Sequence, residues 1–112
     1  MPATLTTHVL DTARGIPGAG IPVRLYQLDG ETRRLIVEPT TNGDGRTDAP
    51  LATSLAPGTY ELVFAVGAYF ARTATATFFD EIPVRFTVDD AGGRYHVPLL
   101  LSPWGYSTYR GS

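Results

Sequence analysis

Two histidines and one arginine are the residues of this sequence best suited to acid–base or anion chemistry. His8 and His96 both lie in apolar, strand-like stretches, and Arg46 follows the turn Asn42-Gly43-Asp44-Gly45. An imidazole with a pKa of about 6.5 can accept a proton from water at neutral pH. An arginine offers a fixed fork of donors to a planar anion. The three side chains are therefore the candidates for acid–base chemistry or anion binding if the fold brings them together.

Each of these residues also has a plain structural interpretation. A lone strand histidine is most often a surface or half-buried side chain, and an arginine after a turn is most often solvated. Two histidines without a third ligand do not match catalytic zinc, so no metal site is predicted. The Asn42–Gly45 turn shares part of a calcium-loop pattern, but Thr40 and Leu51 stand where carboxylates are needed, which favours an ordinary turn.

Short strands separated by turns must position these residues. The chain has 12 glycines and 9 prolines, which long helices tolerate poorly. The predicted strands cover residues 5–11, 21–28, 33–41, 46–47, 59–66, 82–89, 94–102 and 105–110, and residues 67–72 are expected to form one or two helical turns. Turn signals at intervals of about 8–12 residues indicate a sandwich of two sheets.

Strand alternation assigns both histidines to a face that is half apolar. The residues assigned to this face are Thr6, His8, Leu10, His96, Pro98, Leu100, Ser107 and Tyr109, whereas Arg110 falls on the opposite face. A sheet that is apolar on both faces needs a partner on each. In a sandwich of this size, the second partner is expected to be another subunit.

Composition limits the class of protein. The 112 residues predict one domain over residues 1–112, and 43% hydrophobic with 18% charged residues is typical of a globular chain. A net charge of −2 with interspersed signs does not favour nucleic acid, and no apolar run is long enough to span a membrane. There are no cysteines, which excludes disulfides, and no secretory-signal pattern, which predicts a cytoplasmic protein.

Three segments carry a more specific pattern. They are Leu5–Asp11, Thr41–Thr47 and the ending Tyr95–Ser112, which closes with Tyr109-Arg110-Gly111-Ser112. These segments resemble the transthyretin-like 5-hydroxyisourate hydrolase family, and the resemblance extends over essentially the whole chain. The terminal tetrapeptide is the family's most specific signature, and it separates the hydrolases from the transthyretin hormone carriers.

The resemblance implies an all-β, transthyretin-like (prealbumin-like) sandwich of two four-stranded sheets with one short helix. It also implies a homotetramer, built as a dimer of dimers, with active sites in the channel between subunits. The catalytic residues that it implies are His8, Arg46 and His96. The substrate-binding residues that it implies are His8, Arg46, Tyr109, Arg110 and Ser112.

The implied reaction is the hydrolysis of 5-hydroxyisourate to 2-oxo-4-hydroxy-4-carboxy-5-ureidoimidazoline in urate degradation, without a cofactor or metal. Opening this electrophilic ring needs a positioned water, a base and donors for the developing oxyanion. We expect His96, rather than His8, to activate the water and Arg46 to bind the anionic substrate. The alternative function is a non-catalytic transthyretin-like ligand-binding module, although an apolar ligand would leave the histidines and Arg46 poorly paired.

Overall fold

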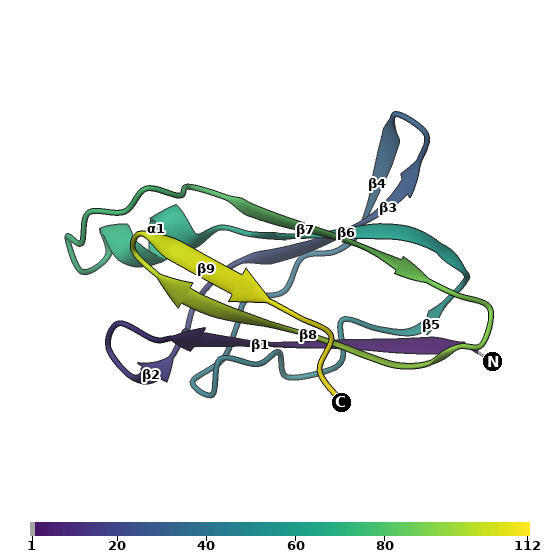
Figure 1. Ribbon diagram of the computed structural model, residues 1–112, viewed down its shortest axis with the longest axis horizontal. Coiled ribbons are helices and arrows are strands. Elements are labelled where there is room, and N and C mark those ends of the chain that lie inside the picture. The colour runs from purple at the N-terminus through teal and green to yellow at the C-terminus, as the bar shows by residue number, and fades with distance from the viewer. Residues whose placement is uncertain (1) are drawn as a thin grey trace.

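The protein consists of two β-sheets packed face to face, with one short helix at an end of the sandwich (Figure 1). The structure is a computed structural model that describes residues 2–112. The strands are β1 (Ala3–Asp11), β2 (Ile16–Pro17), β3 (Val23–Asp29), β4 (Thr32–Val37), β5 (Ala52–Leu55), β6 (Gly58–Phe64), β7 (Ile82–Val88), β8 (Gly93–Ser102) and β9 (Gly105–Thr108), and the helix is α1 (Val66–Ala71). This architecture confirms the predicted all-β sandwich.

The first sheet is built around a parallel pair, β1 and β8. The whole of β1 pairs with β8, from Ala3 opposite Gly93 to Asp11 opposite Leu101. β9 pairs antiparallel with the other edge of β8. The remaining edge of β1 is shared by β5, which pairs near Leu5, and by the two-residue β2. Because β2 and β5 share one edge of β1, the five strands occupy four positions across the sheet. This width agrees with the predicted four-stranded sheet.

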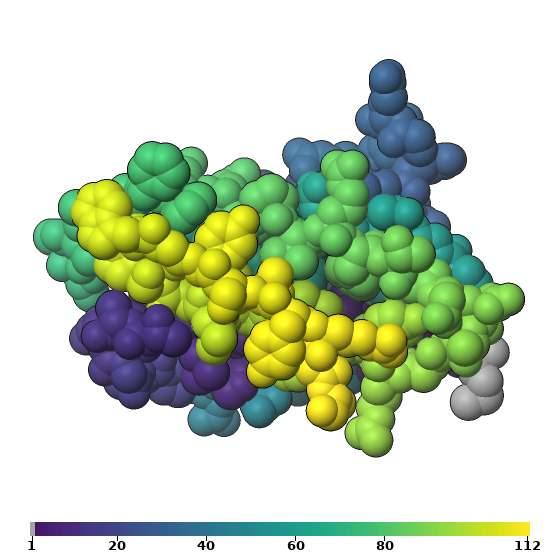
Figure 2. All heavy atoms as spheres, in the orientation of Figure 1, coloured from purple at the N-terminus to yellow at the C-terminus, as the bar shows by residue number. Residues whose placement is uncertain are grey.

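The second sheet is antiparallel throughout, in the order β4-β3-β6-β7. The Asp29-Gly30 turn joins β3 to β4, as predicted, and Gly30 has a φ of 62°, which glycine adopts without strain. This hairpin projects from the body of the molecule (Figures 1 and 2). The central strand β6 is buried from Tyr60 to Phe64, and it contributes Tyr60, Leu62 and Phe64 to the core.

The core follows from alternation along the strands. Every second residue of β1, beginning at Ala3, is buried, and the intervening residues are only half-buried. Fully buried side chains of the two sheets meet between them, among them Leu5, Val9, Leu25, Leu62, Phe64, Leu99 and Leu101. Because Leu5 and Val9 point inward, Thr6 and His8 are turned to the outer face.

Helix α1 is tied to the end of β1 by a buried polar contact. The Tyr69 hydroxyl donates to Asp11 Oδ2 at 2.7 Å, and Asp11 Oδ1 accepts the N–H groups of Ala13 and Arg14, each at 3.1 Å. Burial raises the pKa of Tyr69, and the hydrogen bond to Asp11 raises it further. The helix lies one residue before the predicted span. No helix within residues 2–112 has both the length and the apolar character needed to cross a membrane.

The strand predictions differ from the structure at several places. Residues 46–47, predicted as a strand, lie in a loop, and neither β2 nor β5 was predicted. β5 is a weakly apolar segment that exists because the edge of β1 beside Leu5 is free to pair. The predicted strand over residues 33–41 ends early, at Val37, before Pro39, which has no N–H to donate.

Candidate active site

His96 lies on β8 and is held by a neighbour on β1. The parallel register places Thr6 opposite His96, and Thr6 Oγ1 lies 2.9 Å from His96 Nδ1. The His96 side chain is on the outer face of the first sheet and is half-buried. We call this surface the histidine face: the outward residues of β1 and β8, with the chain end that lies beside them. The contact leaves Nε2 as the ring nitrogen not engaged by Thr6.

His8 lies on the same face, two residues along β1 from Thr6. It is half-buried and stands opposite Pro98 in the strand register. Since His96 and Pro98 are also two residues apart, the two histidines are diagonal neighbours across the parallel pair. The prediction that both histidines share one face is therefore met by the geometry.

Arg46 reaches this face from the Asn42–Arg46 turn. Asn42 Oδ1 accepts the N–H groups of Asp44 at 2.9 Å and of Arg46 at 3.2 Å, which is the ordinary turn that was predicted. The turn is joined to β1 by a hydrogen bond of 2.8 Å from Val9 N–H to the Gly45 carbonyl. Because Val9 follows His8 directly, this bond places Arg46 beside the histidines.

A small cavity lies beside Arg46. It measures about 150 Å³ and is lined by Thr6, Thr7 and the loop of residues 46–50. Thr6 thus touches both the His96 ring and the space in front of Arg46. The cavity is partly open, and polar residues of both β1 and the loop line it, among them Arg46 and Asp48.

The electrostatics of the site favour a neutral His96. Burial lowers its pKa below 6.5, and the electrostatic effects of Arg46 and His8 lower it further, while a hydrogen bond to the Thr6 backbone acts in the opposite direction. The charges act on His96 because both side chains are near its ring. At neutral pH the imidazole is therefore unprotonated, as a general base must be. Among residues 2–112, no group of three or more potential metal-ligating side chains gathers here or elsewhere.

The end of the chain lies against β8. Gly111 N–H donates to the His96 carbonyl at 2.7 Å, in the same register that pairs Thr108 with Leu99. This register puts Tyr109 opposite Pro98, on the histidine face, and Ser112 follows Gly111. In Figure 2 the yellow C-terminal segment lies on the surface across the middle of the molecule.

Arg110 is directed away from the histidines in this subunit. Its guanidinium lies 4.2 Å from the centre of the Tyr95 ring, on the inner side of β8, and also donates to the Arg94 carbonyl at 3.1 Å. There it closes part of an apolar cavity of about 240 Å³ between β7 and β8. Alternation had assigned Arg110 to this side. Its role in substrate binding, implied by the resemblance, stays a prediction.

Sequence reasoning did not single out two residues that contact His96. Thr6 was assigned to the correct face, but its pairing with His96 depends on a contact between residues 90 positions apart. Gly111 was noted only as part of the terminal signature, yet a Cβ at this position would lie 2.6 Å from His96 Cδ2. The available signal was the glycine itself, because a residue without a Cβ allows the backbone to lie close to another group.

Sequence comparison decides the family. The profile of the HIUase/Transthyretin family matches residues 5–111. The chain belongs to the HIUase/Transthyretin family. A relative in Deinococcus radiodurans, named 5-hydroxyisourate hydrolase, is 57% identical over 113 residues, which cover 96% of this chain and 95% of the relative.

Solved structures agree with this family assignment. The Klebsiella pneumoniae 5-hydroxyisourate hydrolase matches with a TM-score of 0.85 and 36% identity, over 98% of this chain and 94% of that protein. An (S)-allantoin synthase matches with a TM-score of 0.90 and 43% identity, over 99% of this chain but 45% of the synthase. The transthyretin-like sandwich is therefore the fold of this family member.

Proposed function

We propose that the protein hydrolyses 5-hydroxyisourate to 2-oxo-4-hydroxy-4-carboxy-5-ureidoimidazoline. The observation that carries the proposal is the convergence of His8, Arg46 and a His96 of lowered pKa on one face. The names and high identity of its relatives support the same substrate. Hydrolysis of a cyclic amide needs a base and an oxyanion partner, and this face offers both.

His96 is the proposed general base. Its Nε2 takes a proton from a water molecule as the water oxygen attacks a carbonyl carbon of the substrate ring. The ring carbon–nitrogen bond then breaks, and the proton passes to the departing nitrogen, so that one water is consumed and the ring opens. Positioned proton transfer of this kind contributes about 10²–10⁴-fold to a rate.

Arg46 and His8 are proposed to bind the substrate beside this base. The Arg46 guanidinium pairs with the anionic, planar ring and stabilises the charge that develops on the attacked carbonyl oxygen. His8 orients the substrate or shares the proton. Tyr109, Arg110 and Ser112 are proposed as further contacts, which for Arg110 requires its side chain to leave Tyr95 or to serve a neighbouring subunit.

We also propose a homotetramer, a dimer of dimers, with the histidine face lining the channel between dimers. Leu10 and Leu100 are only half-buried on this face, next to polar catalytic groups. A second subunit would cover this apolar surface and enclose the substrate. A cytoplasmic location stays a prediction from the sequence.

The direct test follows the decay of freshly generated 5-hydroxyisourate by ultraviolet absorbance. We expect the protein to accelerate decay over the spontaneous rate, and His96→Ala to remove most of the acceleration. A mass measurement on the same sample reports the oligomeric state. Decay at the spontaneous rate with folded protein would reject the proposed reaction, and a stable, active monomer would reject the shared channel.

The transthyretin-like binding module without catalysis is less well supported. An apolar ligand on the histidine face would leave Arg46 and the histidines without polar partners. The same absorbance measurement separates the two functions, because a binding module would leave the decay rate unchanged.

A further inference from the structure

We propose that Thr6 is a positioning residue that sets the tautomer of His96. In this arrangement His96 Nδ1–H donates to Thr6 Oγ1, and Nε2 stays unprotonated and free to accept the proton of the attacking water. The proposal rests on the hydrolysis proposed above, since it assigns a second residue to the general base of that reaction.

The geometry of the pair supports this role. Thr6 and His96 are opposite residues of the parallel β1–β8 pair, and Thr6 Oγ1 lies 2.9 Å from His96 Nδ1. The hydrogen bond made by one imidazole nitrogen determines which nitrogen carries the proton. A threonine suits this task because its β-branched side chain is restricted at χ1, so the hydroxyl is held in place.

The opposite side of the ring is fixed by Gly111. A Cβ added there would lie 2.6 Å from His96 Cδ2 and 3.3 Å from Cγ, so the glycine backbone already sits against the imidazole. The Gly111 N–H also donates to the His96 carbonyl at 2.7 Å. The ring is thus confined between β1 and the end of the chain, with Thr6 at Nδ1 and only Nε2 left for chemistry.

The neighbouring threonine shows what a purely structural contact looks like on this strand. Thr7 is buried on the inner face, and its hydroxyl donates to the Val97 carbonyl at 2.7 Å. That bond links β1 to a backbone carbonyl of β8 and involves no titratable group. The Thr6 hydroxyl instead meets a titratable ring on the half-buried outer face, and it also lines the cavity beside Arg46.

The proposal requires that Thr6 accept the hydrogen bond. If its hydroxyl donated to Nδ1, the proton would sit on Nε2, and His96 could donate to the substrate but not take a proton from water. The two arrangements have the same heavy-atom distance. They differ in which ring nitrogen is protonated, which nitrogen NMR measures directly.

The first measurement is the nitrogen NMR spectrum of labelled His96 in the whole protein, without substrate, at a pH above its pKa. We expect Nδ1 to be protonated and Nε2 unprotonated in the wild type. In Thr6→Val we expect the Nε2-protonated form, which predominates in free histidine, to become the main species. A wild-type spectrum with Nε2 protonated would overturn the proposal without using any variant.

The second measurement is kinetic. Thr6→Val is expected to lower kcat by about 10- to 100-fold with little change in KM, the range seen when outer partners of functional histidines are lost. Thr6→Ser keeps the hydroxyl and should restore both kcat and the wild-type tautomer. Thr4→Val is the matched control, because Thr4 lies on the same face of β1 but opposite Arg94, and it should leave both unchanged.

The outcomes separate this proposal from the function on which it rests. If Thr6→Val keeps the wild-type tautomer and kcat, Thr6 has no positioning role, although the hydrolysis stands. If the wild type does not accelerate 5-hydroxyisourate decay, the function fails whatever the NMR spectrum shows. If Thr6→Val does not fold, the wild-type spectrum and the Thr6→Ser variant still test whether Thr6 sets the tautomer of His96.

Discussion

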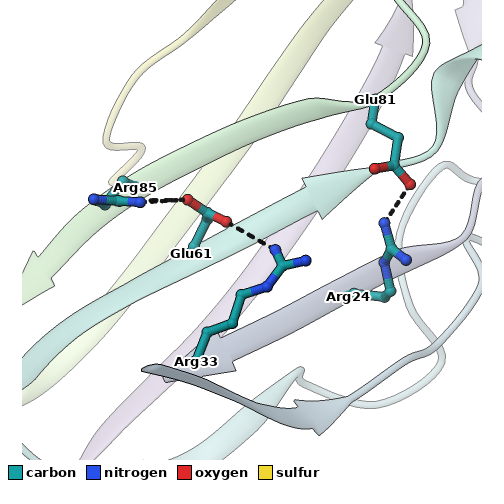
Figure 3. A network of polar contacts seen from close by, with 5 residues as sticks. All are labelled: Arg24, Arg33, Glu61, Glu81 and Arg85. Atoms are coloured by element: carbon teal, nitrogen blue, oxygen red, sulfur yellow. Dashed lines mark hydrogen bonds and ion pairs between the residues drawn. The ribbon is translucent and has the colours of Figure 1, made fainter. Parts of the chain in front are cut away.

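The two outer faces of the sandwich differ in how their charged side chains are paired. On the second sheet, Glu61 lies between two arginines and accepts from Arg33 at 3.4 Å and from Arg85 at 3.1 Å (Figure 3). Beside it, Arg24 pairs with Glu81. We call these five residues the ion-pair face. The histidine face has no comparable pairing: of the ion pairs among residues 2–112, none involves His8, Arg46 or His96.

The two faces differ in whether their charged side chains have ion-pair partners. The ion-pair face satisfies its charges within one subunit, and Arg33 also covers the Tyr26 ring at 4.1 Å. The histidine face keeps positive charge without a carboxylate partner, which an anionic substrate can supply. If the histidine face is the active site as proposed, substitutions on the two faces should have separable effects on activity and stability.

The largest effect is expected from His96→Ala. Loss of the proposed general base should lower kcat by about 10²–10⁴-fold while the fold is retained. Steady-state kinetics on 5-hydroxyisourate measure the loss, and Glu61→Gln is the matched variant on the ion-pair face, expected to keep wild-type kcat. Turnover near the wild-type value in His96→Ala would remove His96 from the mechanism.

Gly111→Ala should come next. The new Cβ, 2.6 Å from His96 Cδ2, requires a shift of the ring or of the chain end. We expect the ring to move, and a misplacement of about 1 Å can cost about 100-fold in rate. Gly105→Ala is the control, because its Cβ would meet only Ser102 Oγ at 3.9 Å. Equal kcat values for the two alanine variants would mean that the His96 ring is not confined by the chain end.

Arg46 variants should separate the role of Arg46 in substrate binding from the effect of its charge on the pKa of His96. Arg46→Lys loses the bidentate fork, which should raise KM by about 10-fold or more, but keeps the charge. Arg46→Gln removes a charge that lowers the pKa of His96, so that pKa should rise towards 6.5. Because the neutral ring is the proposed base, the activity of Arg46→Gln should be lost at a higher pH than that of the wild type or Arg46→Lys as the pH falls.

The measurement for Arg46 is kcat/KM as a function of pH. The acidic limb of the wild type should lie below pH 6.5, since the pKa of His96 is lowered. Identical acidic limbs in all three proteins would show that the Arg46 charge does not act on the base.

The smallest kinetic effect is expected on the ion-pair face. Glu61→Gln should lower the free energy of unfolding by about 1–2 kcal/mol, because Glu61 is buried but its arginine partners are more than half exposed and well screened. Glu81→Gln removes a more exposed carboxylate, 49% exposed against 10% for Glu61, and should cost less than about 1 kcal/mol. Urea denaturation at fixed protein concentration measures both, and a reduced kcat in either variant would contradict the separation of the two faces.

The sequence predicted the local part of this fold well. Alternation from Leu5 to Leu10 assigned these side chains to the faces on which they lie, and the turn after Asn42 formed as expected. β5 escaped prediction because Ala52–Leu55 is weakly apolar and pairs only with the edge of β1. Such a strand depends on a distant edge rather than on its own residues.

The site was predicted only in part for the same physical reason. Alternation placed His8 and His96 each on an outer face, but it could not show that β1 and β8 are adjacent and parallel. The inclusion of Arg46 came from the family resemblance, and the Val9–Gly45 hydrogen bond gives its structural cause. Thr6 was assigned to the right face but its contact with His96 was not predicted, because that contact exists only across the strand pair.

The parallel pairing of β1 with β8 also has a kinetic consequence. It joins the first strand of the chain to one that begins at Gly93, and Thr6 is 90 residues from His96. Contacts so distant in sequence form slowly, because a long loop must close before they contribute. During synthesis, the β3–β6 region leaves the ribosome well before the final strands. We therefore expect Thr6 and His96, the proposed general base, to meet late in folding, and a fragment that lacks β8 to be inactive.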